Sequence, residues 1–200
     1  MRLIIISFLI FFTDQISKFY VKGFYLPLFD FEHGGLPQSR SIPIIHKFFY
    51  ITPVENPGIA FGMDFGPEFK TTISILTIVA TIGLLIYFIK LRKEDFFIRL
   101  SVAVILGGAL GNLMDRIFYG YFYGYGTILS GNVVDFLDLR LFGFFLLNKT
   151  FGIYIFNIAD IAISIGVSGL LIAITKKRRE TKQNNIAEVK NNLTTDQGEF

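Results

Sequence analysis

The chain of 200 residues contains no cysteine and no tryptophan. The missing thiols exclude disulfides, a thiolate nucleophile and any zinc or iron–sulfur site built on cysteine. Its two histidines, His33 and His46, do not stand in an H-E-x-x-H zinc motif, and the sequence has neither a P-loop nor a G-x-S-x-G serine motif. We therefore expect no metal and no cofactor, and we exclude thiol and serine-elbow chemistry.

Charged residues are scarce as well. They make up 18% of the chain, against 52% hydrophobic residues, whereas soluble domains are about 25% charged. The net charge of +3 provides no basic surface for nucleic acid. Apolar segments at about 3–21, 72–89, 97–119 and 152–175 are each long enough for a helix to cross ~30 Å of hydrocarbon. This pattern predicts a membrane all-α fold, a four-transmembrane-helix bundle in contact with membrane lipids.

Basic residues predict the orientation of the spans. They gather in the short link between the second and third segments and directly after the fourth: Lys90, Arg92, Lys93, Arg99 and Lys176-Lys177-Arg178-Arg179. The positive-inside rule then places both termini in the cytoplasm and the long connections, about 22–71 and 118–151, outside. The first segment follows Arg2 and could also be a cleaved signal peptide. Thr13-Asp14-Gln15 is no small-x-small cleavage site, so we interpret this segment as a retained span.

The connections and the tail suggest further organisation. We predict a single domain over residues 1–175 and a disordered cytoplasmic tail over residues 176–200. The tail is predicted to be disordered because the sequence after residue 180 is polar and has no hydrophobic periodicity. Residues 46–65 mix aromatic and β-branched residues with turn formers, which predicts a small outer β-like platform. Residues 136–151 are interpreted as an interfacial amphipathic helix. No internal repeat is visible in the sequence.

Several polar residues lie inside or beside the predicted spans, although a charge at mid-bilayer costs about 2.5–3.5 kcal/mol. They are Asp14, Lys18, Asn112, Asp115, Arg116, Asn157 and Asp160, with Gly108 on the same stripe of the third span and Asp135 just outside the spans. The orientation places the four carboxylates, those of Asp14, Asp115, Asp135 and Asp160, towards the outer leaflet. Taken singly, most have structural explanations, such as ion pairs of Asp14 with Lys18 and of Asp115 with Arg116, or a helix–helix hydrogen bond. Asp160 has no basic residue within four positions, and only Arg140 is near Asp135.

Two carboxylates close together in a low-dielectric site cannot both ionise easily, so one keeps its proton. The ionised group can take a proton from a water molecule as it attacks an amide carbonyl. The protonated group can polarise that carbonyl and later protonate the leaving nitrogen. Asp135 and Asp160 thus indicate an aspartyl hydrolase, although their spacing does not identify a substrate.

Five sequence blocks resemble the signatures of the lipoprotein signal peptidase (signal peptidase II) family. In order, they are Asp14-Gln15-Ile16-Ser17-Lys18, Asn56-Pro57-Gly58-Ile59-Ala60-Phe61, the run Gly-Gly-Ala-Leu-Gly-Asn-Leu-Met-Asp-Arg at 107–116, Val133-Val134-Asp135-Phe136, and Phe156-Asn157-Ile158-Ala159-Asp160. The resemblance implies an intramembrane aspartyl endopeptidase of the bacterial inner membrane. It would cut diacylglyceryl-modified prolipoproteins just before the lipidated cysteine, with its active site facing the outer leaflet.

The resemblance also implies roles for particular residues. Asp135 and Asp160 would be the catalytic pair. The substrate pocket would be formed by Asp14, Lys18, Asn56, Gly58, Gly108, Asn112, Asp115, Arg116 and Asn157. We expect a monomer.

Two stretches, residues 23–45 and 119–130, are longer than the family pattern and can change access to the site. Two other classes remain open on the residues alone. The first is a small ion-coupled membrane transporter that uses Asp14, Asp115 and Asp160 as relays. The second is a non-enzymatic assembly protein that binds partners through its outer aromatic residues.

Overall fold

The computed structural model describes residues 2–58, 67–146 and 149–196. Within this part of the chain, four helices are long and apolar enough to cross a membrane. They are α1 (Ile4–Lys22), α2 (Pro67–Lys90), α3 (Phe96–Met114) and α5 (Ile158–Asp196). The prediction of four spans is therefore confirmed. Their exposed outer surfaces are rich in leucine, isoleucine and phenylalanine, as contact with lipid requires.

Helix α3 is the central helix, and it contacts α1, α2 and α5. Small residues make this packing possible, because a Cβ added at Gly107 would lie 2.8 Å from the Ser7 carbonyl oxygen of α1. The Ser7 hydroxyl in turn donates a hydrogen bond to the Ala103 carbonyl at 2.7 Å. Beyond Met114 the chain continues as a π-helical turn, η4 (Asp115–Tyr119), and a short helix, α4 (Gly120–Phe122). π-Helical turns inside helices are frequent at functional sites.

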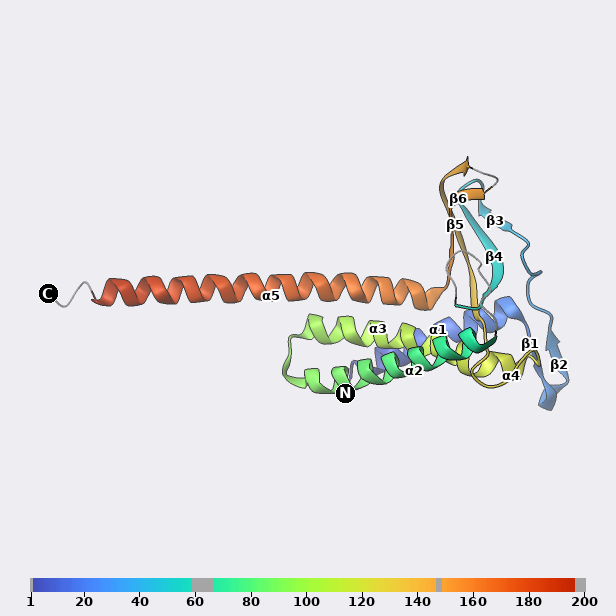
Figure 1. The fold of residues 1–200 in the computed structure, drawn as a ribbon, viewed down its shortest axis with the longest axis horizontal. Coiled ribbons are helices and arrows are strands. Elements are labelled where there is room, and N and C mark those ends of the chain that lie inside the picture. The colour runs from blue at the N-terminus through green and yellow to red at the C-terminus, as the bar shows by residue number, and fades with distance from the viewer. Residues whose placement is uncertain (1, 59–66, 147–148, 197–200) are drawn as a thin grey trace.

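A four-stranded antiparallel sheet stands across one end of the helices (Figure 1). Its strands, in spatial order, are β3 (Ile42–Ile45), β4 (Phe49–Asn56), β5 (Val133–Leu146) and β6 (Lys149–Phe156). A separate hairpin pairs β1 (Phe24–Leu26) with β2 (Phe31–His33) through the 3₁₀ turn η1 (Pro27–Phe29). A sheet was predicted from residues 46–65, and β4 confirms it for the described part of that stretch.

The predicted amphipathic helix at 136–151 is wrong. Residues up to Leu146 belong to β5, and β6 begins at Lys149. The reason is visible in Leu137-Asp138-Leu139-Arg140-Leu141, where apolar and polar residues alternate with the period of a strand, and β4 supplies the paired edge. The fourth span also begins later than predicted, at Ile158, because β6 uses the preceding apolar residues.

The tail differs from its prediction too, because α5 continues as one helix to Asp196 and projects past the other helices in Figure 1. Two ion pairs support its first turns beyond the apolar segment. Lys176 lies 3.9 Å from Glu180 one turn along the helix, and Lys177 pairs with Glu94. Glu94 follows the 3₁₀ turn η3 (Leu91–Lys93), which connects α2 to α3.

Two buried apolar clusters lie at opposite ends of the bundle. Val21, Tyr119, Val134 and Phe136 form one cluster, which joins α1, η4 and β5 below the sheet. The other is built on Leu91, Ile98 and Val102 near the α2–α3 connection. The first cluster packs the start of β5 against the spans. Asp135 lies between two of its members, Val134 and Phe136, in the sequence.

Candidate active site

Asp135 and Asp160 come from different elements and meet at one residue, Asn157. Asp135 is the third residue of β5 and is 5% exposed, and Asp160 lies in the first turn of α5. The side-chain Nδ2 of Asn157 donates to Asp135 Oδ1 at 2.7 Å, and its backbone N–H donates to Asp160 Oδ2 at 3.2 Å. The sequence prediction that these two acids converge is consistent with this shared partner.

The local sequence explains why Asn157 and Asp160 adopt this arrangement. Asn157 directly precedes α5, and its Oδ1 accepts a hydrogen bond from the Asp160 backbone N–H at 2.9 Å. Together with the reverse bond from the Asn157 N–H to the Asp160 carboxylate, this is a reciprocal capping box at the start of a helix. The cap therefore fixes the Asp160 carboxylate relative to the backbone through contacts that are local in sequence.

Further amide side chains hold each carboxylate. Asn56 pairs with Val133 across the sheet, so its side chain lies on the same sheet face as that of Asp135. Asp135 Oδ2 accepts a hydrogen bond from Asn56 Nδ2 at 3.0 Å. Asn112 on α3 donates from Nδ2 to Asp160 Oδ1 at 2.9 Å. Among the described residues, neither acid forms an ion pair with a lysine or arginine. Arg140, the one basic residue near Asp135 in sequence, pairs instead with Asp138 at 2.6 Å.

Burial above all, and with it the negative charge of Asp160, raises the pKa of Asp135 to about 7. The hydrogen bonds from Asn56 and Asn157 oppose this shift because they favour the ionised form. A pKa near 7 means that Asp135 exchanges its proton in the neutral range. The pair can therefore hold a single proton near neutral pH, as acid–base chemistry by two carboxylates requires.

A fully buried ionic cluster lies beneath the carboxylate pair. Lys18 Nζ is 2.8 Å from Asp14 Oδ2, 2.8 Å from Asp115 Oδ2 and 3.0 Å from Asn112 Oδ1. The side chains of Lys18, Asp14 and Asp115 have no exposed surface. The pairing of Asp14 with Lys18 confirms their expected shared helix face. The ion pair of Asp115 with Arg116, one of the structural explanations considered above, is not formed, because adjacent helical residues point in different directions.

This cluster is bonded to the neighbours of both candidate catalytic acids. Asp115 Oδ2 accepts from the Val134 backbone N–H at 3.2 Å, one residue before Asp135. Asp14 Oδ1 accepts from the Ala159 backbone N–H at 2.9 Å, one residue before Asp160. Lys18 joins the two anchoring carboxylates, so the cluster sets the spacing between strand β5 and helix α5.

Gln15 belongs to the same network, and the sequence analysis did not single it out. Its Nε2 donates to Asp14 Oδ2 at 3.1 Å, to Asp115 Oδ1 at 2.9 Å and to the Gly111 carbonyl at 3.0 Å. Its Oε1 accepts from the Tyr119 hydroxyl at 3.1 Å. An uncharged polar residue next to Asp14 inside a span was the available signal, because such a group must find partners in a membrane.

The two predicted glycines have different functions. Gly58 has a φ of 100°, and its N–H donates to Asn56 Oδ1 at 2.8 Å, which turns the Asn56 amide nitrogen towards Asp135. A Cβ at Gly58 would lie 2.6 Å from Arg116 Nη1. A Cβ at Gly108 would lie 2.4 Å from the Ala159 carbonyl oxygen, so Gly108 permits the close packing of α3 on α5.

The predicted substrate-binding residues thus differ in how far they are exposed. Asp14, Lys18, Asp115 and Asn157 are fully buried. Arg116 Nη1 is buried beside Gly58 and has no hydrogen-bond partner among residues 2–58, 67–146 and 149–196. Residues 59–61 of the second sequence block lie outside the described residues.

These features define a membrane protein of four apolar helices with a carboxylate pair held by neutral amides. No group of three or more His, Asp or Glu side chains that could hold a metal occurs in the described ranges. A carboxylate pair with this environment is suited to general acid–base hydrolysis.

Comparison with known proteins assigns the family. The model of the family "Signal peptidase (SPase) II" matches residues 6–176. Two proteins called lipoprotein signal peptidase are similar to this chain. The protein of Moorella thermoacetica is 34% identical, over 84% of this chain and 88% of its own length. The protein of Syntrophus aciditrophicus is 36% identical, over 86% of this chain and 91% of its own length. The chain belongs to the signal peptidase II family, and it is therefore an aspartic protease.

Solved structures agree with this assignment. Two structures described as bacterial membrane enzymes have TM-scores of 0.65 and 0.63 and are 29% and 30% identical. The first comparison covers 88% of this chain and 89% of that chain, and the second covers 86% and 92%. The alternative of an ion-coupled transporter is not supported.

Proposed function

We propose that the protein is an intramembrane endopeptidase that removes the signal peptide from diacylglyceryl-modified bacterial prolipoproteins, with Asp135 and Asp160 as its catalytic residues. It cuts just before the lipidated cysteine. The observation that carries the proposal is the bridge through Asn157, which hydrogen-bonds both acids at 2.7 and 3.2 Å. The name lipoprotein signal peptidase, which the similar proteins share, supports the substrate class.

In the proposed mechanism, the pair starts with one proton, held on Asp135. Burial and the charge of Asp160 favour this state, because both raise the pKa of Asp135. Asp160 then accepts a proton from water as the water oxygen attacks the scissile carbonyl carbon, and Asp135 gives its proton to the carbonyl oxygen. When the tetrahedral intermediate collapses, Asp135 regains that proton, and Asp160 delivers its own proton to the leaving nitrogen.

Arg116 is placed to bind the substrate backbone next to the acids. The buried Arg116 Nη1 has no partner within the described residues, and Gly58 leaves the space in front of it. A substrate carbonyl would satisfy this donor, since an unwound peptide has no water to bond at that depth. Asp14, Lys18 and Asp115 act as positioning residues through Val134 and Ala159.

We further propose that both termini are cytoplasmic and that the sheet and the carboxylate pair face the outer leaflet. The basic residues of the α2–α3 connection and the basic turn of α5 lie at the end of the bundle away from the sheet (Figure 1). The positive-inside rule assigns that end to the cytoplasm. We propose a monomer whose single domain spans residues 1–175.

The substrate assignment is tested with one precursor peptide in two forms. Purified protein in detergent is given the precursor with and without the diacylglyceryl group on its cysteine, and products are identified by mass spectrometry. We expect cleavage only of the modified form, with the modified cysteine as the new N-terminal residue. Equal cleavage of both forms, or a cut elsewhere in the peptide, would overturn the proposed substrate class.

A further inference from the structure

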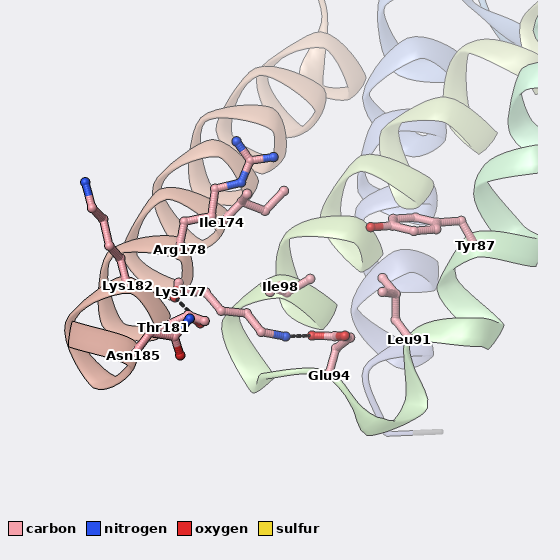
Figure 2. Close-up of a pocket in the computed structure, with 10 residues that line it drawn as sticks. All are labelled: Tyr87, Leu91, Glu94, Ile98, Ile174, Lys177, Arg178, Thr181, Lys182 and Asn185. Carbon is pink, nitrogen blue, oxygen red and sulfur yellow. Dashed lines mark hydrogen bonds and ion pairs between the residues drawn. The ribbon is translucent and has the colours of Figure 1, made fainter. Parts of the chain in front are cut away.

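A second cleft lies at the end of the bundle away from the carboxylate pair. It is an open cleft with a volume of about 860 Å³, bordered by the end of α2, the α2–α3 connection, the start of α3 and helix α5 (Figure 2). Leu91, at the start of the connection between α2 and α3, is 6% exposed. The proposed mechanism gives this cleft no role.

One side of the cleft is apolar. Tyr87, Leu91 and Ile98 line it from α2, η3 and α3, and Ile174 lines it from α5. Leu91 and Ile98 belong to the buried apolar cluster at this end of the bundle, so the apolar surface is firmly packed from behind. A surface of this kind at the end of membrane-spanning helices is suited to a hydrocarbon chain.

The other side is basic. Lys177, Arg178 and Lys182 line the cleft from α5, about one to two helical turns beyond Ile174 of its apolar wall. Lys177 is paired with Glu94, and this ion pair ties α5 to the α2–α3 connection (Figure 2). Arg178 and Lys182 are exposed and have no ion-pair partner among the described residues. The border of the cleft therefore carries two positive charges that its own residues do not neutralise, although the Lys182 amino group points away from α3 in Figure 2.

We propose that this cleft is a binding site for an anionic phospholipid of the adjacent leaflet. One acyl chain lies along the apolar residues, and the headgroup phosphate lies beside Arg178 and Lys182. The charge of the cleft and its depth in the membrane together favour an anionic phospholipid. A zwitterionic lipid does not neutralise the two charges, and a soluble anion does not cover the apolar wall. Basic clefts between spans at a membrane surface bind anionic headgroups in this way.

The experiment uses the full-length chain, purified and delipidated in a neutral detergent. Native mass spectrometry measures the binding of phosphatidylglycerol and of phosphatidylcholine with identical acyl chains. The test variant is Arg178→Gln/Lys182→Gln. The matched control is Lys176→Gln/Arg179→Gln, which removes the same charge from the same helix at residues that line a different hollow.

We expect the wild type and the control to prefer phosphatidylglycerol, and the test variant to bind it about 10- to 30-fold more weakly. Arg178→Gln alone should give an intermediate loss. Inorganic phosphate at the same concentration should not displace the lipid. All variants should unfold at the wild-type temperature, because the changed side chains are exposed.

Three outcomes would overturn the proposal. The first is an equal loss of binding in test and control variants, which would indicate only a general attraction to basic residues. The second is no preference for phosphatidylglycerol in the wild type, which would leave a protein partner as the occupant. The third is complete displacement by inorganic phosphate, which would identify a phosphate site without a role for the acyl chain.

Discussion

Replacing Lys18 with methionine should strongly destabilise the protein without abolishing its chemistry. Methionine keeps most of the side-chain volume and removes the charge that joins Asp14 and Asp115, each 2.8 Å from Nζ. Both carboxylates are fully buried, so the substitution leaves two unpaired acids away from water. Breaking a buried ion pair by removing one partner costs about 3–5 kcal/mol.

That loss converts to a measurable shift in unfolding temperature. For a chain of this length, each kcal/mol corresponds to about 2–4 °C, so we expect Tm to fall by about 6–20 °C. Circular dichroism in detergent micelles measures it, because the chain has no tryptophan for fluorescence. Lys177→Met is the matched control. Its ion pair is 47% exposed on the lysine side, and such a pair contributes less than about 1 kcal/mol.

A double substitution separates charge from shape. Adding Asp115→Asn to Lys18→Met removes one of the two unpaired charges. We therefore expect the double variant to lose about 1–3 kcal/mol less stability than the sum of the losses in the two single variants. The folded fraction of Lys18→Met should still cleave precursor, since Lys18 contacts neither Asp135 nor Asp160. A Tm within 2 °C (roughly 1 kcal/mol) of the wild type, or strict additivity in the double variant, would refute the role given to the cluster.

Three further predictions follow from the site. Asn157→Ala should lower kcat about 100-fold with a smaller change in KM, because it releases both acids from their shared partner; steady-state kinetics with an unchanged kcat would contradict this. Gly108→Ala should destabilise the α3–α5 contact, whereas Gly83→Ala on α2, where a new Cβ meets nothing within 4 Å, should not; equal Tm values for the two would argue against the close packing. The pKa of Asp135 rises from 3.8 to about 7 on folding, so the wild type loses stability as pH rises through that range. The Tm of Asp135→Asn minus that of the wild type should therefore increase between pH 4 and 7 and stay level above, and a flat difference would disprove the shift.

The sequence was sufficient for the spans because span length and apolar composition are local properties. The i,i+4 spacing of Asp14 and Lys18 likewise predicted a pair that the structure contains. The reciprocal cap of Asn157 and Asp160 could also have been predicted, since both residues stand at capping-box positions before an apolar run.

The remaining features depend on which helices become neighbours, and no local pattern contains that information. Asp115 pairs with Lys18 rather than with the adjacent Arg116 because α1 packs against α3. Gly108 is required by the Ala159 carbonyl of α5, a residue 51 positions later in the numbering. The continuation of β5 after Phe136 was mistaken for a helix, although apolar and polar residues alternate over 137–141, because the β4 edge that it pairs with is far away in sequence.

The central claim is that Asp135 and Asp160 together carry the reaction, and one kinetic comparison tests it most directly. Asp135→Asn, Asp160→Asn and the control Asp138→Asn are assayed for cleavage of diacylglyceryl-modified precursor, after circular dichroism has confirmed that each is folded. Asp138 is a buried acid on the same strand but is held by Thr52 and Arg140. We predict that the first two variants show no turnover above background and that Asp138→Asn remains active. Turnover near the wild-type rate in either Asp135→Asn or Asp160→Asn would contradict the account.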